Sequence, residues 1–311
     1  MSSTVTHVGF ADESHWNTGR FRSLGMVTLS LSHLESIEGE VRRLLNESDV
    51  QEFKWSSLSG ARERFAAEKL CAFAVDKASA GQLRVDVLVW DIEDSRHKIP
   101  KRDDNANLGR MYYHLFRSVL RKRWPDNAIW RLHPDEHTAM DWETLQDFLE
   151  RKSVSIETNR SLFADNRFPS RLRRKFGIEE IRPVSSGGHP LLQIADLFAG
   201  LAVFSHEKYN EYKKWLQNSS GQESFLAEDD TSSNPSRSSQ ERFTVLKQFD
   251  EACKRRRLGV SLKSYNGLRT PDPRNPINFW MYEAQHPEDK APQKSGKSEF
   301  SFRSAPDERD A

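Results

Sequence analysis

The strongest apolar run in the chain is Pro190–Phe204, whose polar side chains are Gln193 and Asp196. Its length and the lack of an early break predict a helix rather than a strand. Because apolar side chains surround almost the whole circumference, we expect this helix to be buried. Gln193, Asp196 and Gly200 recur at intervals that place them on one helical face.

Asp196 is therefore a carboxylate in an apolar setting. Burying such a group costs several kcal/mol, roughly, unless it is paired, protonated or bound to a metal. The sequence predicts a partner for Asp196. An Arg or Lys would make a buried ion pair. In the metal-binding alternative, the small Gly200 and the polar Gln193 beside Asp196 would leave room for an ion and a phosphate.

A second pattern opens the chain. Val5–Ser14 is typical of a strand and ends in the acids Asp12 and Glu13. Arg20–Ser32 predicts a second strand, antiparallel to the first and joined to it by a polar turn. On a strand, Glu13 would point to the face opposite Asp12.

The remaining pattern is a mixture of helices and strands. It lacks the regular alternation of a doubly wound sheet, so we expect an α/β fold with a mixed sheet flanked by helices. The predicted helices are His33–Leu45, Ala61–Ala78, Asn107–Trp124 and Glu241–Arg256, and the further predicted strands are Gln51–Trp55, Leu83–Trp90, Ala128–Leu132 and Glu180–Val184.

Composition divides the chain into four parts. Residues 1–217 form the predicted α/β domain, and residues 218–240 are rich in Ser, Asp, Glu and Asn, as a disordered insertion would be. Residues 241–286 predict a C-terminal helix followed by an extended arm packed on the core. Residues 287–311 are charged and rich in Pro and Ser, which predicts a disordered tail.

Charge and cysteine content exclude several classes of protein. The chain has 311 residues, a net charge of +1 and two distant cysteines, Cys71 and Cys253. A disulfide framework is not expected, and any basic surface must be local. The first residues lack a basic stretch followed by an apolar one, and no apolar run reaches about 18 residues. We therefore expect a cytoplasmic protein without a membrane partner.

Several short motifs, taken together, resemble the DUF3800 family. They are Ala11-Asp12-Glu13-Ser14, Glu52-Phe53-Lys54-Trp55, Asp135 after a strand, Ser185-Ser-Gly-Gly188, and Leu192-Gln-Ile-Ala-Asp196-Leu-Phe-Ala-Gly200. The resemblance covers roughly residues 5 to 207, and His15 stands where family members often have Gly. It implies a ribonuclease-H-like fold, similar to Holliday-junction resolvases, and a setting in anti-phage defence or mobile elements.

The resemblance also implies a metal site. In nucleases of the ribonuclease H type, carboxylates from separate elements hold divalent ions about 3.5–4 Å apart. Asp12, Asp135 and Asp196 are the expected ligands, with Glu13 and Asp91 as further candidates. Oxygen ligands favour Mg²⁺ or Mn²⁺ over Zn²⁺.

Glu52 and Lys54 are further catalytic candidates. They would share one face of the predicted strand, where Glu52 could bind metal and Lys54 could hold a phosphate or orient a water molecule. Each candidate has a structural alternative. Asp12 could cap a turn and Asp135 a helix, Asp91 could belong to a solvated acidic loop, and Glu52 with Lys54 could be a surface cross-strand pair.

Other chemistries have little support. His133 and His137 have helical zinc-ligand spacing, but Pro134 lies between them and no third ligand is evident. The sequence contains no glycine-rich phosphate loop, dinucleotide-binding fingerprint or serine nucleophile elbow.

One basic cluster is interleaved with phenylalanines, a pattern compatible with phosphate contact and base stacking. A loop with buried phenylalanines is the structural alternative. The cluster comprises Arg160, Arg167, Arg171, Arg173, Arg174 and Lys175.

The leading hypothesis is thus a Mg²⁺- or Mn²⁺-dependent phosphodiesterase that cleaves DNA or RNA. The rival hypothesis is a non-catalytic subunit that binds nucleic acid or a protein partner within a defence complex.

Overall fold

The computed structural model describes residues 4–15, 17–93, 104–136, 176–219, 235–263 and 265–283, with the single residues 140, 142 and 145. These residues form an α/β fold with a six-stranded mixed sheet and six α-helices. The strands are β1 (His7–Ser14), β2 (Phe21–Ser30), β3 (Leu83–Asp91), β4 (Trp130–Pro134), β5 (Ile178–Ile181) and β6 (Ile277–Met281). The helices are α1 (Leu34–Glu47), α2 (Ala61–Ser79), α3 (Asp104–Lys122), α6 (Pro190–Glu207), α7 (Tyr209–Ser219) and α8 (Arg237–Arg255).

The sheet has the order β5-β4-β1-β2-β3-β6. Strand β2 pairs antiparallel with β1 and β3, whereas the β1–β4, β4–β5 and β3–β6 pairs are parallel. The opening hairpin is therefore confirmed. Since five strands run in one direction, the carboxyl ends of the neighbours β1 and β4 meet at the same edge of the sheet.

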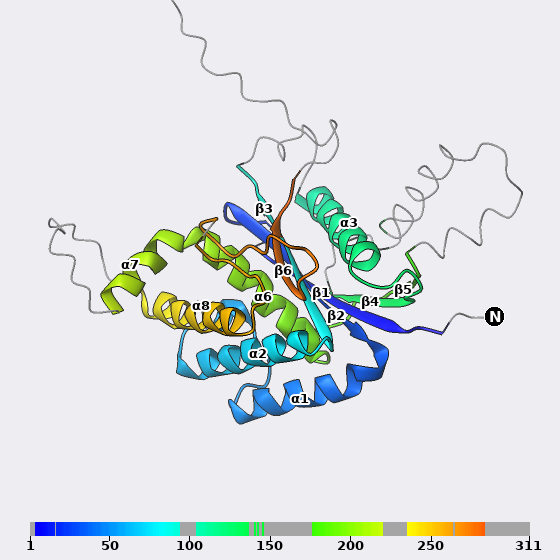
Figure 1. The fold of residues 1–311 in the computed structure, drawn as a ribbon, viewed down its shortest axis with the longest axis horizontal. Helices are drawn as coiled ribbons and strands as arrows, with labels where there is room; N and C mark the ends of the chain where they lie inside the picture. Colours follow the sequence, from blue (N-terminus) through cyan, green and yellow to red (C-terminus); the bar gives the residue numbers. More distant parts are fainter. Residues whose placement is uncertain are drawn as a thin grey trace, which may run out of the picture.

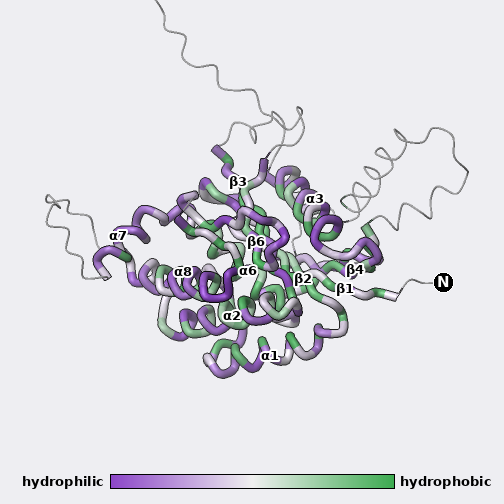
Figure 2. The backbone as a smooth tube through the Cα atoms, in the orientation of Figure 1, coloured by the Kyte–Doolittle hydropathy of each residue, from purple (hydrophilic) through white to green (hydrophobic). Residues whose placement is uncertain are grey.

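Two apolar cores lie on the two faces of the sheet. Val8 and Phe10 pack with α1, α2, α6 and α8, whereas Ala11 packs with α3. Figure 1 shows α1, α2, α6 and α8 on one side of the strands and α3 on the other. The hydrophobic positions gather on the strands and α6, and the hydrophilic ones on the outer helix surfaces (Figure 2). Helix α6 is buried, as its apolar circumference predicts.

Two predictions about local structure need revision. Residues 51–54 do not form a strand, because the backbone N–H groups of Phe53 and Trp55 donate to side chains of α6 instead of to a neighbouring strand. A short 3₁₀ helix, Trp55–Ser57, follows them. The C-terminal arm is more than a packed extension, since it supplies the edge strand β6.

The ends of the predicted insertion are helical. Helix α7 continues to Ser219, and α8 begins at Arg237, where the Ser236 side chain accepts a hydrogen bond from the Ser239 N–H. Such an N-cap satisfies a free N–H group in the first turn and fixes where the helix begins. Residues 220–234 of the predicted insertion and the predicted tail at 287–311 lie outside the described residues.

Candidate acidic site at the carboxyl ends of β1 and β4

Two of the expected acids lie side by side where β1 and β4 end. In the parallel pairing of these strands Ala11 is opposite Pro134, so Asp12 and Asp135 occupy the next positions. The Asp135 N–H donates to the Ala11 carbonyl at 2.8 Å and fixes this register. Asp12 follows Val8 and Phe10 on the face of β1 that α6 covers, which places its carboxylate beneath that helix.

The third acid, Asp196, reaches this point because α6 approaches the sheet closely. Gly25 is the register partner of Asp12 on β2. A Cβ atom at Gly25 would collide with the carbonyl oxygen of Ala195, the residue before Asp196. The missing side chain at Gly25 therefore lets α6 bring Asp196 beside Asp12.

Residues 52–55 cover the same stretch of α6. The Phe53 N–H donates to the Gln193 side-chain oxygen at 2.8 Å, and the Trp55 N–H donates to Asp196 Oδ2 at 2.6 Å. The Trp55 ring lies against Gly200, where a Cβ atom would overlap it. Gln193 and Gly200 therefore hold the 52–55 segment on α6, and the expectation that they leave room for an ion and a phosphate is wrong.

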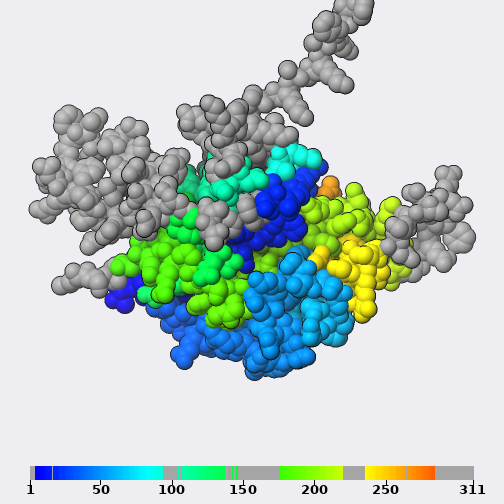
Figure 3. All heavy atoms as spheres, turned by 180° about the vertical axis from the view of Figure 1, so that it is seen from behind, coloured from blue at the N-terminus to red at the C-terminus, as the bar shows by residue number. Residues whose placement is uncertain are grey.

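The 52–55 segment also places the side chains of Glu52 and Lys54 at the acidic site. Lys54 Nζ lies 3.3 Å from Glu52 Oε1, which also accepts a 2.6 Å hydrogen bond from the Ser186 hydroxyl. Lys54 interacts electrostatically with Asp135 and Asp12 as well. Figure 3 shows the N-terminal strands in dark blue, the following blue segment and the green segment after residue 176 meeting on one face.

Without a bound cation, burial and the neighbouring acids disfavour the ionised form of the carboxyl groups in this cluster. Burial raises the pKa of Asp12 well above its usual value, and the charges of Asp196 and Asp135 raise it further. Burial also raises the pKa of Asp196, to about 6, although the Trp55 N–H and Lys54 oppose this change. These causes are the desolvation and like-charge effects that are common at functional sites.

The pKa values of Asp135, Glu52 and Lys54 at the edge of the site are shifted as well. Burial raises the pKa of Asp135. The Ser186 hydrogen bond lowers the pKa of Glu52, which keeps that carboxylate charged. Burial opposes the ammonium form of Lys54, but the carboxylates of Glu52, Asp135 and Asp12 outweigh it and raise the pKa of Lys54. Lys54 is thus a cation among several buried or half-buried acids.

Glu13 faces the other side of the sheet, as strand alternation predicts. Its carboxylate accepts a 2.7 Å hydrogen bond from the hydroxyl of Tyr112 on α3, and its N–H donates to Asp12 Oδ1 at 2.7 Å. Burial raises the pKa of the Tyr112 hydroxyl, and the Glu13 charge adds to that effect. Glu13 therefore contacts the acidic site through its own backbone N–H, which binds the Asp12 carboxylate.

Asp91 lies apart from the acidic site. It ends β3, two strands from β1, and makes a bidentate ion pair with Arg20 at 2.7–3.1 Å. The pairing of Asp91 with Phe21 and of Asp12 with Gly25 on the same strand β2 separates the two acids along the sheet. Asp135, rather than Asp91, is the acid that the structure brings to Asp12.

Two sets of candidates lie outside the described residues. The basic cluster Arg160, Arg167, Arg171, Arg173, Arg174 and Lys175 is one, and His137 is the other. His133 lies on β4 with its ring stacked on His189 and its Nδ1 3.0 Å from the Arg182 carbonyl oxygen.

Two site residues were not identified as such from the sequence. Tyr112 carries no signal beyond an apolar helical face. Ser186 lies in the Ser-Ser-Gly-Gly loop that the family resemblance singled out, but nothing in that motif indicates which serine would turn inward.

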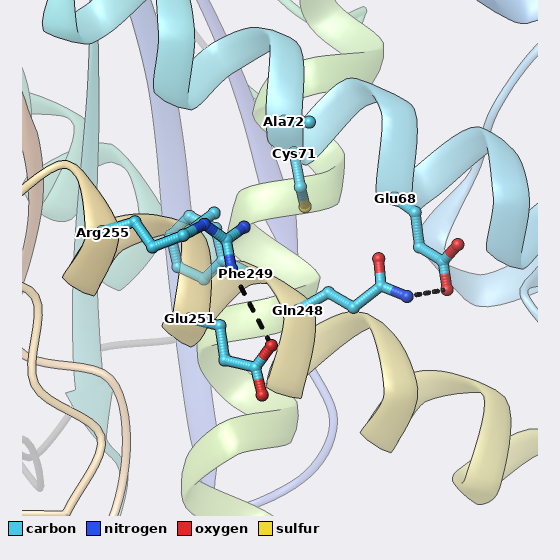
Figure 4. Close-up of a pocket in the computed structure, with 8 residues that line it drawn as sticks. Glu68, Cys71, Ala72, Gln248, Phe249, Glu251 and Arg255 are labelled. Carbon is cyan, nitrogen blue, oxygen red and sulfur yellow. Dashed lines mark hydrogen bonds and ion pairs between the residues drawn. The ribbon is translucent and has the colours of Figure 1, made fainter.

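Across the described part of the chain, no three His, Cys, Asp or Glu side chains form a ready-made metal-binding group. A cavity of about 310 Å³ lies apart from the acidic site, between α2 and α8. In Figure 4 the Cys71 thiol points toward it, beside a 3.0 Å hydrogen bond from Gln248 to Glu68. Burial raises the pKa of the Cys71 thiol, which makes it a poor nucleophile.

The fold and site together define an α/β protein with a buried acidic cluster at the carboxyl edge of its sheet. The chain is 39% identical over 300 residues to the uncharacterized protein ORF2′ of Methanothermobacter thermautotrophicus, covering 94% of this chain and 99% of that protein. The uncharacterized protein ORF2 of the same organism matches with the same identity and coverage. The chain belongs to the family that these ORF2 proteins represent.

No family model matches the chain. Among the helices that the structure describes, none is long and apolar enough to cross a membrane.

Proposed function

We propose that this protein is a metal-dependent phosphodiesterase that cleaves DNA or RNA. The observation that carries the proposal is the convergence of Asp12, Asp135 and Asp196 from β1, β4 and α6, with raised pKa values. Bringing like charges together under a buried helix is costly, and a bound divalent cation is the usual compensation.

The strand order supports a ribonuclease-H-like arrangement and the DUF3800 resemblance. Strand β1 lies inside the sheet between β4 and β2, where the first strand of such folds is expected. Acids at the ends of β1 and β4 and on a later helix are the set that the resemblance predicted.

The donor chemistry of the cluster fits Mg²⁺ or Mn²⁺. Asp12, Asp135 and Asp196 would hold the ion, since carboxylate oxygens are its preferred ligands. The ion would supply activation of a water molecule and stabilisation of the leaving oxygen. Lys54 is placed to contact a phosphate oxygen of the substrate, and the Trp55 N–H fixes the Asp196 carboxylate at 2.6 Å.

The test is incubation with labelled DNA and RNA of several structures, in Mg²⁺, in Mn²⁺ and in EDTA. We expect cleavage with metal, none in EDTA, and a loss of at least about a thousandfold in Asp12→Asn and in Asp196→Asn. Asp91→Asn is the matched control, because Asp91 also ends a strand but pairs with Arg20. Full activity in either site variant would overturn the assignment.

The non-catalytic alternative keeps one supporting observation. The described carboxylates do not form a ready-made metal group, as would suit a subunit that binds nucleic acid or a protein partner without cleaving it. Binding of the labelled nucleic acids without cleavage in any metal would favour this alternative.

A further inference from the structure

A closed set of hydrogen bonds joins three segments next to the acidic site. The Gln193 side chain accepts from the Phe53 N–H at 2.8 Å and donates to the Ser186 carbonyl at 3.0 Å. The Ser186 hydroxyl then donates to Glu52 Oε1 at 2.6 Å. We call Gln193 and Ser186 the amide–hydroxyl clamp. It ties residues 52–53 and the 185–188 loop to α6.

The clamp is buried and its polar groups are used. Gln193 is 2% exposed and Ser186 is 8% exposed. Both ends of the Gln193 amide are satisfied, and a buried polar group that lost its partner would destabilise the fold. An apolar residue in place of Gln193 could also fill this part of α6, but it would not set the position of the neighbouring segments. The hydrogen bonds of the clamp therefore fix the position of residues 52–53 as well as adding stability.

The residue whose position the clamp controls is Lys54. Its neighbours Phe53 and Trp55 are both buried, with their N–H groups bound to Gln193 and Asp196. Lys54 itself has extended backbone angles, φ −133° and ψ 130°. In an extended segment successive side chains alternate, so Lys54 points away from the buried pair, on the side of Glu52, where the two form an ion pair at 3.3 Å.

We propose that Gln193 and Ser186 are positioning residues that act through Lys54, holding its ammonium group among the carboxylates to receive a phosphate of the substrate. This inference rests on the proposed phosphodiesterase function. It assigns to the glutamine of α6 and to the serine loop a role in orienting a cation, distinct from binding metal.

A double-mutant cycle tests the inference. We expect Ser186→Ala to lower kcat about tenfold and Lys54→Met about a hundredfold, with the double variant within about twofold of Lys54→Met. A merely structural serine would give multiplied losses. Ser205→Ala is the matched control, since Ser205 is also buried and its hydroxyl joins α6 to the Leu268 N–H. It should leave kcat unchanged.

Amide hydrogen exchange of the metal-free protein gives a second readout that needs no activity. Ser186→Ala should speed exchange at Phe53, and Ser205→Ala should not. Unchanged exchange at Phe53, or multiplied losses of kcat, would overturn the clamp while leaving the nuclease assignment intact. If the wild-type protein cleaves no substrate in any metal, the proposed function fails first and the role of the clamp falls with it.

Discussion

Individual carboxylates in this protein are buried in two different ways. Asp86 is fully buried, and it is paired with Arg123 and lies 3.6 Å from Arg84. Asp12 is also buried and Asp196 is half-buried, and other acids are among the charged neighbours of both. A structural carboxylate is compensated within the fold, whereas these two remain open to a cation from outside.

This contrast predicts opposite effects of neutralising the two kinds of acid. The folded-state pKa of Asp196 is about 6, above its unfolded value. Its contribution to stability is therefore complete below about pH 4 and is lost as pH rises through about 6. In EDTA, Asp196→Asn should stabilise the protein at pH 8 by on the order of 3 kcal/mol, at about 1.4 kcal/mol per pKa unit.

Urea unfolding at pH 5 and pH 8 measures this difference. Asp86→Asn is the control, and it should destabilise the protein by about 3–5 kcal/mol because Arg123 is left unpaired. If Asp196→Asn destabilised the protein at pH 8 as Asp86→Asn does, Asp196 would be a structural carboxylate instead of an open ligand.

At the scale of elements, the site depends on how closely α6 crosses the sheet. Gly25 in β2 lies against the Ala195 carbonyl of α6, and Gly200 in α6 lies against the Trp55 ring. At each position a neighbouring group occupies the space that a side chain would need, so glycine is required there for steric reasons. Neither glycine has a positive φ angle.

Gly25→Ala should therefore push α6 away from the sheet. We expect a loss of about 1–3 kcal/mol from overpacking, together with a loss of catalytic activity as Asp196 moves from Asp12. Gly39→Ala is the matched control: Gly39 lies in α1 with open space around it, so alanine should raise stability by up to about 1 kcal/mol. Thermal melting and cleavage assays of both variants test this prediction. If Gly25→Ala changed neither the stability nor the activity, α6 would be able to shift without cost.

Prediction from sequence succeeded where the pattern is local. The opening hairpin and the buried helix at residues 190–204 follow from short-range periodicity, and both are observed. Strand alternation also placed Glu13 and Asp12 on opposite faces correctly.

The sequence failed where a distant partner decides the conformation. Gln51–Trp55 alternates like a strand, but its backbone donors bind Gln193 and Asp196, about 140 residues away along the chain. The inward turn of Ser186 and the Tyr112 contact with Glu13 depend on the same kind of long-range packing. Nothing within those short segments distinguishes such contacts from solvent exposure.

For the whole molecule, metal binding and folding should be coupled. A cation that binds the folded acidic site and not the unfolded chain stabilises the fold by mass action, by about 2.7 kcal/mol at a concentration one hundred times its Kd. We expect Mn²⁺ to raise the Tm in a saturable way at pH 8 and much less at pH 5, where protons compete for the carboxylates.

Differential scanning calorimetry of wild type and Asp12→Asn tests this coupling. The variant should show little or no Mn²⁺-dependent rise in Tm, whereas Asp91→Asn should behave as wild type does. An unchanged Tm at millimolar Mn²⁺ in the wild-type protein would favour the non-catalytic alternative.

The parallel pairing of β6 with β3 also sets the order in which the protein can be completed during synthesis. Strand β3 gains its partner on that side only when residues 277–281 have left the ribosome. Until then the nascent chain presents an unpaired strand edge, to which another strand could add. The last described strand therefore decides when the long apolar strand β3 ceases to be the exposed edge on that side, which then passes to the shorter β6.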